Sequence, residues 1–256
     1  MHPFLDHPGP LAFAHRGGAA ERTENTHAAF AHARDLGYRY LETDVHATSD
    51  GVVAVIHDPS LERMAGRPGQ ITSLSWAEVN AAELPGGQRV PRLDELLEEW
   101  PDARWNIDAK ADSVLVPLLG VLRRGKAMGR VCVTSFSDRR IARLRALAGP
   151  DLCTAMGSRA VAALRAASYL PDPGVARRGW GTAAAAQVPL RSSGFPVADA
   201  RFLRAAHGIG LAVHVWTIDD ASIMDALLDL GVDGIMTDRP TVLRDVLVAR
   251  GAWHND

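Results

Sequence analysis

Two short stretches of the chain combine histidine with charged side chains in a way that suits cleavage of a phosphate ester. One begins at His15-Arg16, and the other ends in His57-Asp58. A histidine transfers protons near neutral pH, and a guanidinium binds a phosphate oxygen. A lone histidine at a strand end is more often a hydrogen-bonded structural residue, but the flanking Arg16 and Asp58 favour chemistry. We predict His15 and His57 as catalytic acid and base and Arg16 as a phosphate ligand.

Between these stretches lie two carboxylates, Glu42 and Asp44, spaced two residues apart. On a strand this spacing puts both side chains on one face, where buried like charges call for a cation. Asp108 and Lys110 repeat the spacing, and Lys110 is one of only two lysines in an arginine-rich chain. Carboxylate ligands indicate Mg²⁺ or Ca²⁺, with Mn²⁺ as a further option. A structural ion-pair cluster is the alternative interpretation.

Two further residues at strand ends are candidates for substrate binding. Gln187 ends an alanine-rich strand, and a buried amide needs hydrogen-bond partners such as substrate hydroxyls. Trp216 provides either a wall for a polyol or apolar group or plain core packing. His214 shares its strand face with Trp216 and is a weaker candidate, whereas His46 is expected in a loop.

The elements that must position these residues alternate between short apolar runs and helical patterns along the whole chain. This alternation predicts an α/β fold, a single (β/α)8 TIM barrel, with a doubly wound open sheet as the runner-up. We expect residues 1–256 to form one domain, with a small excursion after the second strand at about residues 60–92. A loop rich in Pro, Gly and Arg is expected to run to Gly181. The strands are expected at Leu11–Ala14, Tyr40–Asp44, Trp105–Ala109, Val131–Ser135, Leu152–Ala155, Ala183–Val188, Leu211–Trp216 and Gly234–Thr237.

The chemically interesting residues fall at the carboxyl ends of these strands, where barrel enzymes place their active sites.

The net charge of -2 gives no reason to expect nucleic acid or an anionic membrane as a partner. No apolar run is long enough to span a membrane and no signal peptide is evident, so a cytoplasmic protein is the expectation. We expect a monomer or a small homo-oligomer.

In sequence, the chain resembles the glycerophosphodiester phosphodiesterases of the compact bacterial type. The resemblance covers nearly the whole chain and rests on the order and spacing of many short motifs. These are His15-Arg16-Gly17, Glu24-Asn25-Thr26, Glu42-x-Asp44-Val45, Thr48-x-Asp50-Gly51, His57-Asp58, Val90-Pro91-x-Leu93-x-Glu95-Leu96, Asn106-Ile107-Asp108-x-Lys110, Val215-Trp216-Thr217, Gly231-Val232-Asp233-Gly234 and Thr237-Asp238-Arg239-Pro240.

The resemblance implies a metal-dependent hydrolysis of glycerophosphodiesters to sn-glycerol 3-phosphate and an alcohol, through a cyclic phosphate. By this analogy one divalent metal ion is bound by Glu42, Asp44 and Asp108, and Arg16 and Lys110 hold the phosphate. Asp108 stands where the family usually has Glu, so it is expected to bind the metal less directly, or through water.

The short excursion leaves little room for a cap over the site, and we expect modest specificity for the alcohol. Two alternative functions remain open. One is a lysophospholipase D, which needs an apolar groove for an acyl chain, and the other is a non-catalytic barrel that binds phosphodiesters.

Overall fold

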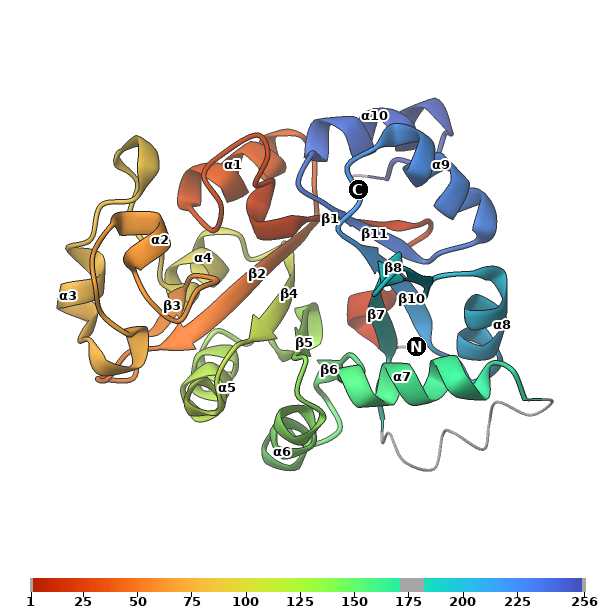
Figure 1. The fold of residues 1–256 in the computed structure, drawn as a ribbon. Coiled ribbons are helices and arrows are strands. Elements are labelled where there is room, and N and C mark those ends of the chain that lie inside the picture. Colours follow the sequence, from red (N-terminus) through yellow and green to blue (C-terminus); the bar gives the residue numbers. More distant parts are fainter. Residues whose placement is uncertain (1, 171–181, 255–256) are drawn as a thin grey trace.

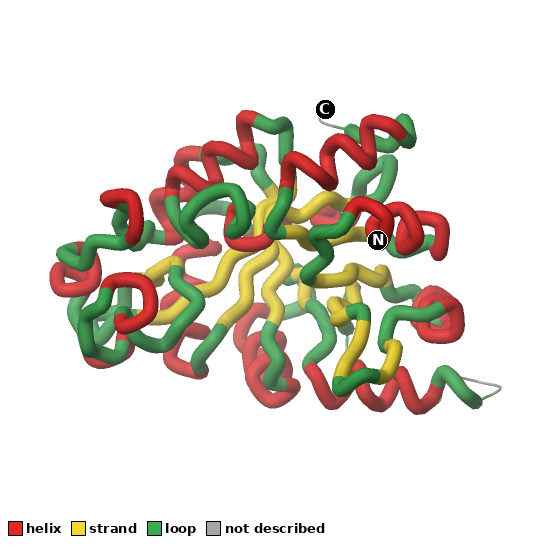
Figure 2. The backbone as a smooth tube through the Cα atoms, turned by 45° about the horizontal axis from the view of Figure 1, so that its top comes forward, coloured by secondary structure: helices red, strands yellow, loops and turns green. Residues whose placement is uncertain are grey.

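The computed structural model describes residues 2–170 and 182–254, and its centre is a ring of parallel strands surrounded by helices (Figures 1 and 2). Within the described residues, eight parallel strands follow the order β6-β5-β4-β2-β1-β11-β10-β7. A parallel bridge between Ala155 and Ala185 joins the two ends of this path and almost closes the barrel. The predicted TIM barrel is therefore confirmed.

The eight strands and the helices that cover them alternate in sequence. The strands are β1 (Leu11–Ala14), β2 (Tyr40–Ala47), β4 (Arg104–Ala109), β5 (Val131–Thr134), β6 (Cys153–Thr154), β7 (Ala185–Pro189), β10 (Ala212–Trp216) and β11 (Gly234–Thr237). The outer helices are α1 (His27–Asp35), α4 (Leu93–Glu99), α5 (Leu115–Arg124), α6 (Asp138–Ala148), α7 (Ser158–Ala167), α8 (Ala200–Gly208), α9 (Ala221–Leu230) and α10 (Pro240–Ala249). Since helices cover one strand face and the barrel interior the other, every residue of β2 is buried.

The insertion after β2 contains β3 (Val53–Val55), α2 (Glu62–Ala65) and α3 (Trp76–Asn80). It lies at the left of Figure 1, in orange and yellow, beside α1 and α4. A small apolar cluster of its own, which includes Ala54, Leu61, Ile71 and Val79, stabilises it. The excursion expected from the sequence is thus present, and it is anchored by β3, which pairs antiparallel with β2.

One expectation needs correction, one element was not predicted, and one expectation falls largely outside the described residues. The strand expected to end at Asp44 continues to Ala47 because it also pairs with β3, so His46 is a buried strand residue and not a loop residue. The hairpin of β8 (Arg191–Ser192) and β9 (Phe195–Pro196) was not predicted. Most of the Pro-, Gly- and Arg-rich loop, at residues 171–181, lies outside the described residues.

Candidate active site

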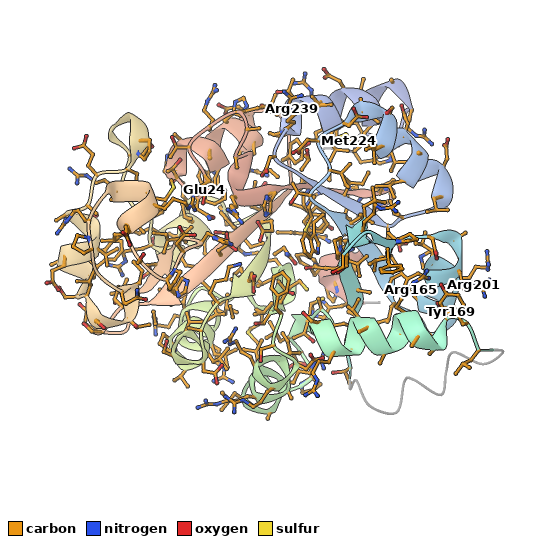
Figure 3. All side chains as sticks on the ribbon, viewed as in Figure 1. Glu24, Arg165, Tyr169, Arg201, Met224 and Arg239 are labelled. Carbon is orange, nitrogen blue, oxygen red and sulfur yellow. The ribbon has the colours of Figure 1, made fainter. Side chains whose placement is uncertain are left out.

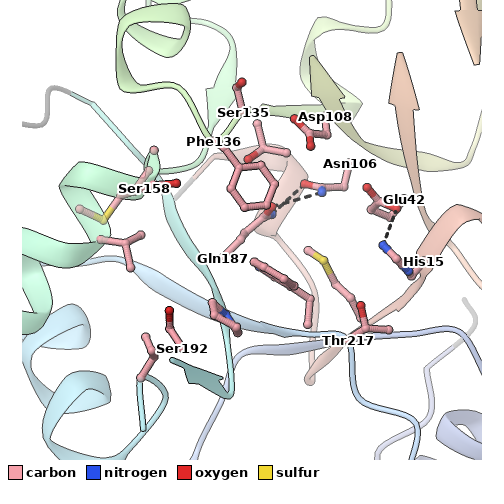
Figure 4. A pocket seen from close by; sticks show the side chains of 18 of the residues that line it. His15, Glu42, Asn106, Asp108, Ser135, Phe136, Ser158, Gln187, Ser192 and Thr217 are labelled. Carbon is pink, nitrogen blue, oxygen red and sulfur yellow. Dashed lines mark hydrogen bonds and ion pairs between the residues drawn. The ribbon is translucent and has the colours of Figure 1, made fainter. Parts of the chain in front are cut away.

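All nine residues selected from the sequence line one pocket of about 800 Å³. The pocket lies over the carboxyl ends of the strands, which is where a barrel of this type places its chemistry (Figure 4). The nine are His15, Arg16, Glu42, Asp44, His57, Asp108, Lys110, Gln187 and Trp216.

His15 follows β1 directly and is held by a carboxylate from the other end of the chain. The backbone turns sharply after it, with Arg16 at φ 51° and Gly17 at φ 80°. A Cβ at Gly17 would lie 2.7 Å from Cβ of Ala29, so only glycine allows α1 to pack against this turn. Nδ1 of His15 lies 2.7 Å from Oδ1 of Asp238, and Nε2 lies 3.8 Å from Oε2 of Glu42.

Glu42 and Asp44 are both buried, as their alternating positions on β2 predict. Burial, together with the neighbouring Asp44 charge, raises the pKa of Glu42 to about 7. Burial acts on Asp44 in the same direction, but Lys110 and Arg16 outweigh it and hold the pKa of Asp44 below its usual value. The amide of Asn25 also donates to Oδ2 of Asp44 at 2.9 Å.

Lys110 places its ammonium between two carboxylates. Its Nζ lies 2.8 Å from Oδ1 of Asp44 and donates to Oδ2 of Asp108 at 2.7 Å. Asp44 and Asp108 are register partners on adjacent strands, so one lysine reaches both. Two of the three ammonium hydrogens are thereby used, and one donor remains for a ligand in the pocket.

The carboxylates differ in how well they suit a metal ion. Among the residues described, no three side chains of ligand type form an arrangement that would hold a metal ion. Glu42, however, is a buried carboxyl whose raised pKa reports negative charge that nearby protein groups compensate only in part. Glu42 is therefore the carboxylate that fits a hard divalent cation best, whereas Lys110 engages both Asp44 and Asp108.

His57 and Arg16 face the pocket with their outer atoms held by carboxylates. Nδ1 of His57 lies 2.7 Å from Oδ1 of Asp58. Nη1 of Arg16 donates to Oε1 of Glu24 at 3.2 Å. Nε of Arg16 is buried and lacks a hydrogen-bond acceptor among the described residues, although Oδ2 of Asp44 lies 3.2 Å away in an ion pair. An anion in the pocket would supply that acceptor.

Gln187 and Trp216 lie on the opposite side of the barrel mouth. The side chain of Gln187 exchanges two hydrogen bonds with the amide of Asn106 (Figure 4). Its Nε2 also lies 3.3 Å from Nδ1 of His214. The amide thus has protein partners, although it lines the pocket. Trp216 packs edge-on against Phe136, with ring centroids 5.7 Å apart. His214 itself is fully buried beneath them.

An apolar surface makes up much of the rest of the pocket, and we call it the apolar wall. Its residues come from the loops after β5 and β6, from α7, from β7, and from β9 and the residue that follows it. They are Phe136, Met156, Val161, Pro189, Phe195 and Val197. Phe136 and Phe195 are 60% and 75% exposed, which is unusual for large apolar side chains and marks a surface available for binding.

Sequence reasoning did not select three residues that support the site. Asn25 links Thr43 to Asp44, Asp238 holds His15, and Phe136 lies 5.8 Å from the Lys110 ammonium. Asn25 and Asp238 belong to the motifs Glu24-Asn25-Thr26 and Thr237-Asp238-Arg239-Pro240, so both could have been selected from those motifs. Phe136 follows β5, and nothing in its immediate sequence distinguishes it.

Known proteins of one family resemble this chain over most of its length. The model of the glycerophosphoryl diester phosphodiesterase family matches residues 15–242. The chain belongs to this family. It is 42% identical over 98% of its length, and 95% of the relative's, to a probable glycerophosphodiester phosphodiesterase 2 of Mycobacterium tuberculosis. It is 28% identical, over 91% of its length and 85% of the relative's, to human lysophospholipase D GDPD1.

Solved structures of the family share the fold. A putative glycerophosphoryl diester phosphodiesterase from Silicibacter pomeroyi matches with a TM-score of 0.82 and 23% identity, over 99% of this chain and 100% of that one. A phosphodiesterase from Oleispira antarctica, solved in complex with the product sn-glycerol-3-phosphate, matches with a TM-score of 0.78 and 21% identity, over 94% and 97% of the two chains. The predicted enzyme class, a glycerophosphodiester phosphodiesterase, is confirmed by the family match. Among the described residues, no helix is long and apolar enough to cross a membrane.

Proposed function

We propose that this phosphodiesterase hydrolyses glycerophosphodiesters to sn-glycerol 3-phosphate and an alcohol, with His15 and His57 as acid and base. The observation that supports this most is that two histidines, each paired with a carboxylate through Nδ1, meet in one pocket with the buried Nε of Arg16. Residues of this type in this arrangement favour phosphoryl transfer over binding alone.

The carboxylates define which nitrogen of each histidine reacts. An ionised carboxylate can only accept a hydrogen bond, so Asp238 and Asp58 require the proton on Nδ1 of His15 and His57. Nε2 of each ring makes no hydrogen bond to the described residues, although Nε2 of His15 lies 3.8 Å from Oε2 of Glu42. One ring is neutral, and its Nε2 takes the proton of the glycerol 2-hydroxyl as that oxygen attacks phosphorus. The other ring starts as the imidazolium, and its Nε2–H protonates the departing alcohol as the phosphorus–oxygen bond breaks. In the second step, water opens the cyclic phosphate and the two proton transfers reverse.

The remaining polar residues bind the phosphate. Arg16 offers its buried Nε to one oxygen, and the third hydrogen of Lys110 is available to another. Members of this family typically depend on a divalent metal. We propose that Glu42 and Asp44 hold Mg²⁺ or Ca²⁺, with Asp108 bound less directly because it stands where the family usually has the longer Glu. When bound, such an ion stabilises the negative charge that develops on the phosphate oxygens.

A chelator-stripped preparation tests this proposal. Glycerophosphocholine is added with Mg²⁺, Ca²⁺ or Mn²⁺ singly, and glycerol 3-phosphate is followed with a coupled dehydrogenase. We expect release that requires metal and falls at least about 100-fold in His15→Ala. His27→Ala, which removes an exposed histidine, is the matched control and is expected to retain full activity. Metal-independent release, or equal activity in both variants, would contradict the proposed mechanism.

A lysophospholipase D function is the second candidate, and the apolar wall is the observation that favours it. A pocket of about 800 Å³ lies toward the upper end of the roughly 300–1,000 Å³ typical of drug-sized ligands, and glycerol phosphate is much smaller. An acyl chain would cover Phe136 and Phe195, which are otherwise exposed. Comparing kcat/KM for lysophosphatidylcholine and glycerophosphocholine separates the two functions. A higher value for the lysolipid would favour the second.

A further inference from the structure

Arg63 joins two carboxylates that hold active-site residues, although it belongs to the insertion and not to the barrel. It lies on α2, and its guanidinium donates four hydrogen bonds. Nε and Nη2 donate to Asp58, at 2.5 Å to Oδ2 and 3.2 Å to Oδ1. Nη2 and Nη1 donate to Glu24, at 2.6 Å to Oε1 and 3.2 Å to Oε2. The planar fork of arginine suits such a double contact, whereas lysine would offer a point charge.

Each of the two carboxylates has a second partner in the pocket. Oδ1 of Asp58 lies 2.7 Å from Nδ1 of His57, and Oε1 of Glu24 accepts a hydrogen bond from Nη1 of Arg16. Figure 3 shows Glu24 where the insertion meets the segment leading into α1. Arg63 is therefore connected through Asp58 to His57, the proposed proton-transfer group. It is connected through Glu24 to Arg16, the proposed phosphate ligand.

An ordinary surface ion pair would not justify a functional role, because exposed pairs contribute little to stability and often nothing measurable. Arg63 differs because the two carboxylates that it contacts are largely buried. Its own side chain is 47% exposed, but the side chains of Glu24 and Asp58 are only 15% and 19% exposed. Hydrogen bonds from Arg63, and next from His57, lower the pKa of Asp58 to about 2. Asp58 therefore remains a charged acceptor, as the Nδ1–H tautomer of His57 requires.

We propose that Arg63 is a positioning residue whose bridge between Asp58 and Glu24 fixes Nε2 of His57 relative to the guanidinium of Arg16. This inference rests on the proposed function, because it assumes that His57 transfers a proton and that Arg16 binds phosphate. The insertion then contributes to catalysis itself, since it fixes the distance between the proton-transfer group and the phosphate.

Steady-state kinetics on glycerophosphocholine test the bridge. Arg63→Ala is expected to lower kcat/KM about 10- to 100-fold, as is usual when a residue that orients an active-site group is lost. Asp58→Asn is expected to act mainly on kcat, through His57. Glu24→Gln is expected to act mainly on KM, through Arg16, and Arg63→Ala on both. Arg63→Lys should recover only part of the loss. Arg67→Ala, on the exposed surface of the same insertion, is the matched control and should match the wild type.

A proton NMR measurement separates positioning from a general loss of structure. The hydrogen of His57 Nδ1, bonded to a carboxylate, should give a low-field signal that is identified by its loss in His57→Gln. We expect this signal to be lost or shifted in Arg63→Ala and Asp58→Asn, at an unchanged Tm, and retained in Glu24→Gln and Arg67→Ala. Wild-type kinetics together with an unchanged signal in Arg63→Ala would overturn the proposal. The NMR signal does not depend on turnover. It therefore shows whether Arg63 orients His57 even if the proposed reaction on glycerophosphocholine is wrong.

Discussion

Oδ1 of Asp238 lies 2.7 Å from Nδ1 of His15, although 223 residues separate them in the chain. The same contact recurs between Asp58 and His57, which are adjacent in sequence. The two proposed proton-transfer groups thus use the same local chemistry, supplied once by the residue that follows β11 and once by a neighbour in sequence.

Replacing Asp238 by asparagine should therefore impair catalysis more than folding. Without the carboxylate, the Nδ1–H tautomer of His15 loses its preference and Nε2 is no longer fixed as the reactive atom. We expect kcat to fall roughly 10²- to 10⁴-fold, measured as glycerol 3-phosphate release. Asp225→Asn, which changes an exposed carboxylate on α9, is the control and should leave kcat unchanged. A kcat within about threefold of the wild type would show that Asp238 does not orient His15.

Lys110→Met should make the stability of the protein depend on metal. The substitution leaves Asp44 and Asp108 buried with one fewer cation, and breaking a buried pair costs about 3–5 kcal/mol. We expect urea unfolding in chelator to show a loss of this order, and added Mg²⁺ or Ca²⁺ to recover more stability in the variant than in the wild type. Lys126→Met, at the other lysine of the chain, should have little effect, because Lys126 is exposed. Equal stabilities of wild type and Lys110→Met in chelator would contradict this expectation.

His214 should make the folded state sensitive to acid. Burial lowers its pKa from 6.5 to about 4, so the folded protein binds fewer protons here than the unfolded chain does. The stabilisation is fully present above pH 6.5 and is lost as the pH falls toward 4, which amounts to at most about 3 kcal/mol. We expect the free energy of unfolding of His214→Asn to decline less steeply than that of the wild type between these pH values. His27→Asn, at an exposed histidine, should keep the wild-type slope. Parallel curves for wild type and His214→Asn would mean that another group dominates this range.

The apolar wall should distinguish substrates by their apolar substituents. Truncating Phe195 to alanine removes a side chain whose burial by a ligand would contribute about 1.5–3 kcal/mol. We expect kcat/KM for lysophosphatidylcholine to fall roughly 10- to 100-fold, with little change for glycerophosphoethanolamine. Val116→Ala, an exposed position on α5, serves as the control. An equal loss on both substrates would show that Phe195 supports the site and does not contact an acyl chain.

The fold and the positions of the site residues could be predicted because both depend on local patterns. Strands buried on both faces appear as short apolar runs, and the two-residue spacing of Glu42 and Asp44 places both carboxylates on one face. The barrel then brings Asp44 beside Asp108, since the register of β2 and β4 pairs them.

The parts that were missed depend on contacts between distant segments. His46 is buried because β2 pairs with β3 as well as with β4, which the run ending at Asp44 does not reveal. The β8–β9 hairpin has two residues in each strand, too few for a periodic pattern. The Arg63 bridge joins residues up to 39 positions apart, and no spacing rule relates them.

The bridge between Ala155 and Ala185 should also affect how the pocket accommodates ligands of different size. The strands β2 and β4, which carry the site carboxylates, are joined along six residue pairs. In contrast, β6 and β7 are joined by this one bridge and two backbone hydrogen bonds. Met156 and Pro189, which belong to the apolar wall, follow these two strands at the same seam. We therefore expect the barrel to be more compliant beneath the apolar wall than beneath Glu42, Asp44 and Asp108, the residues proposed to hold the metal ion.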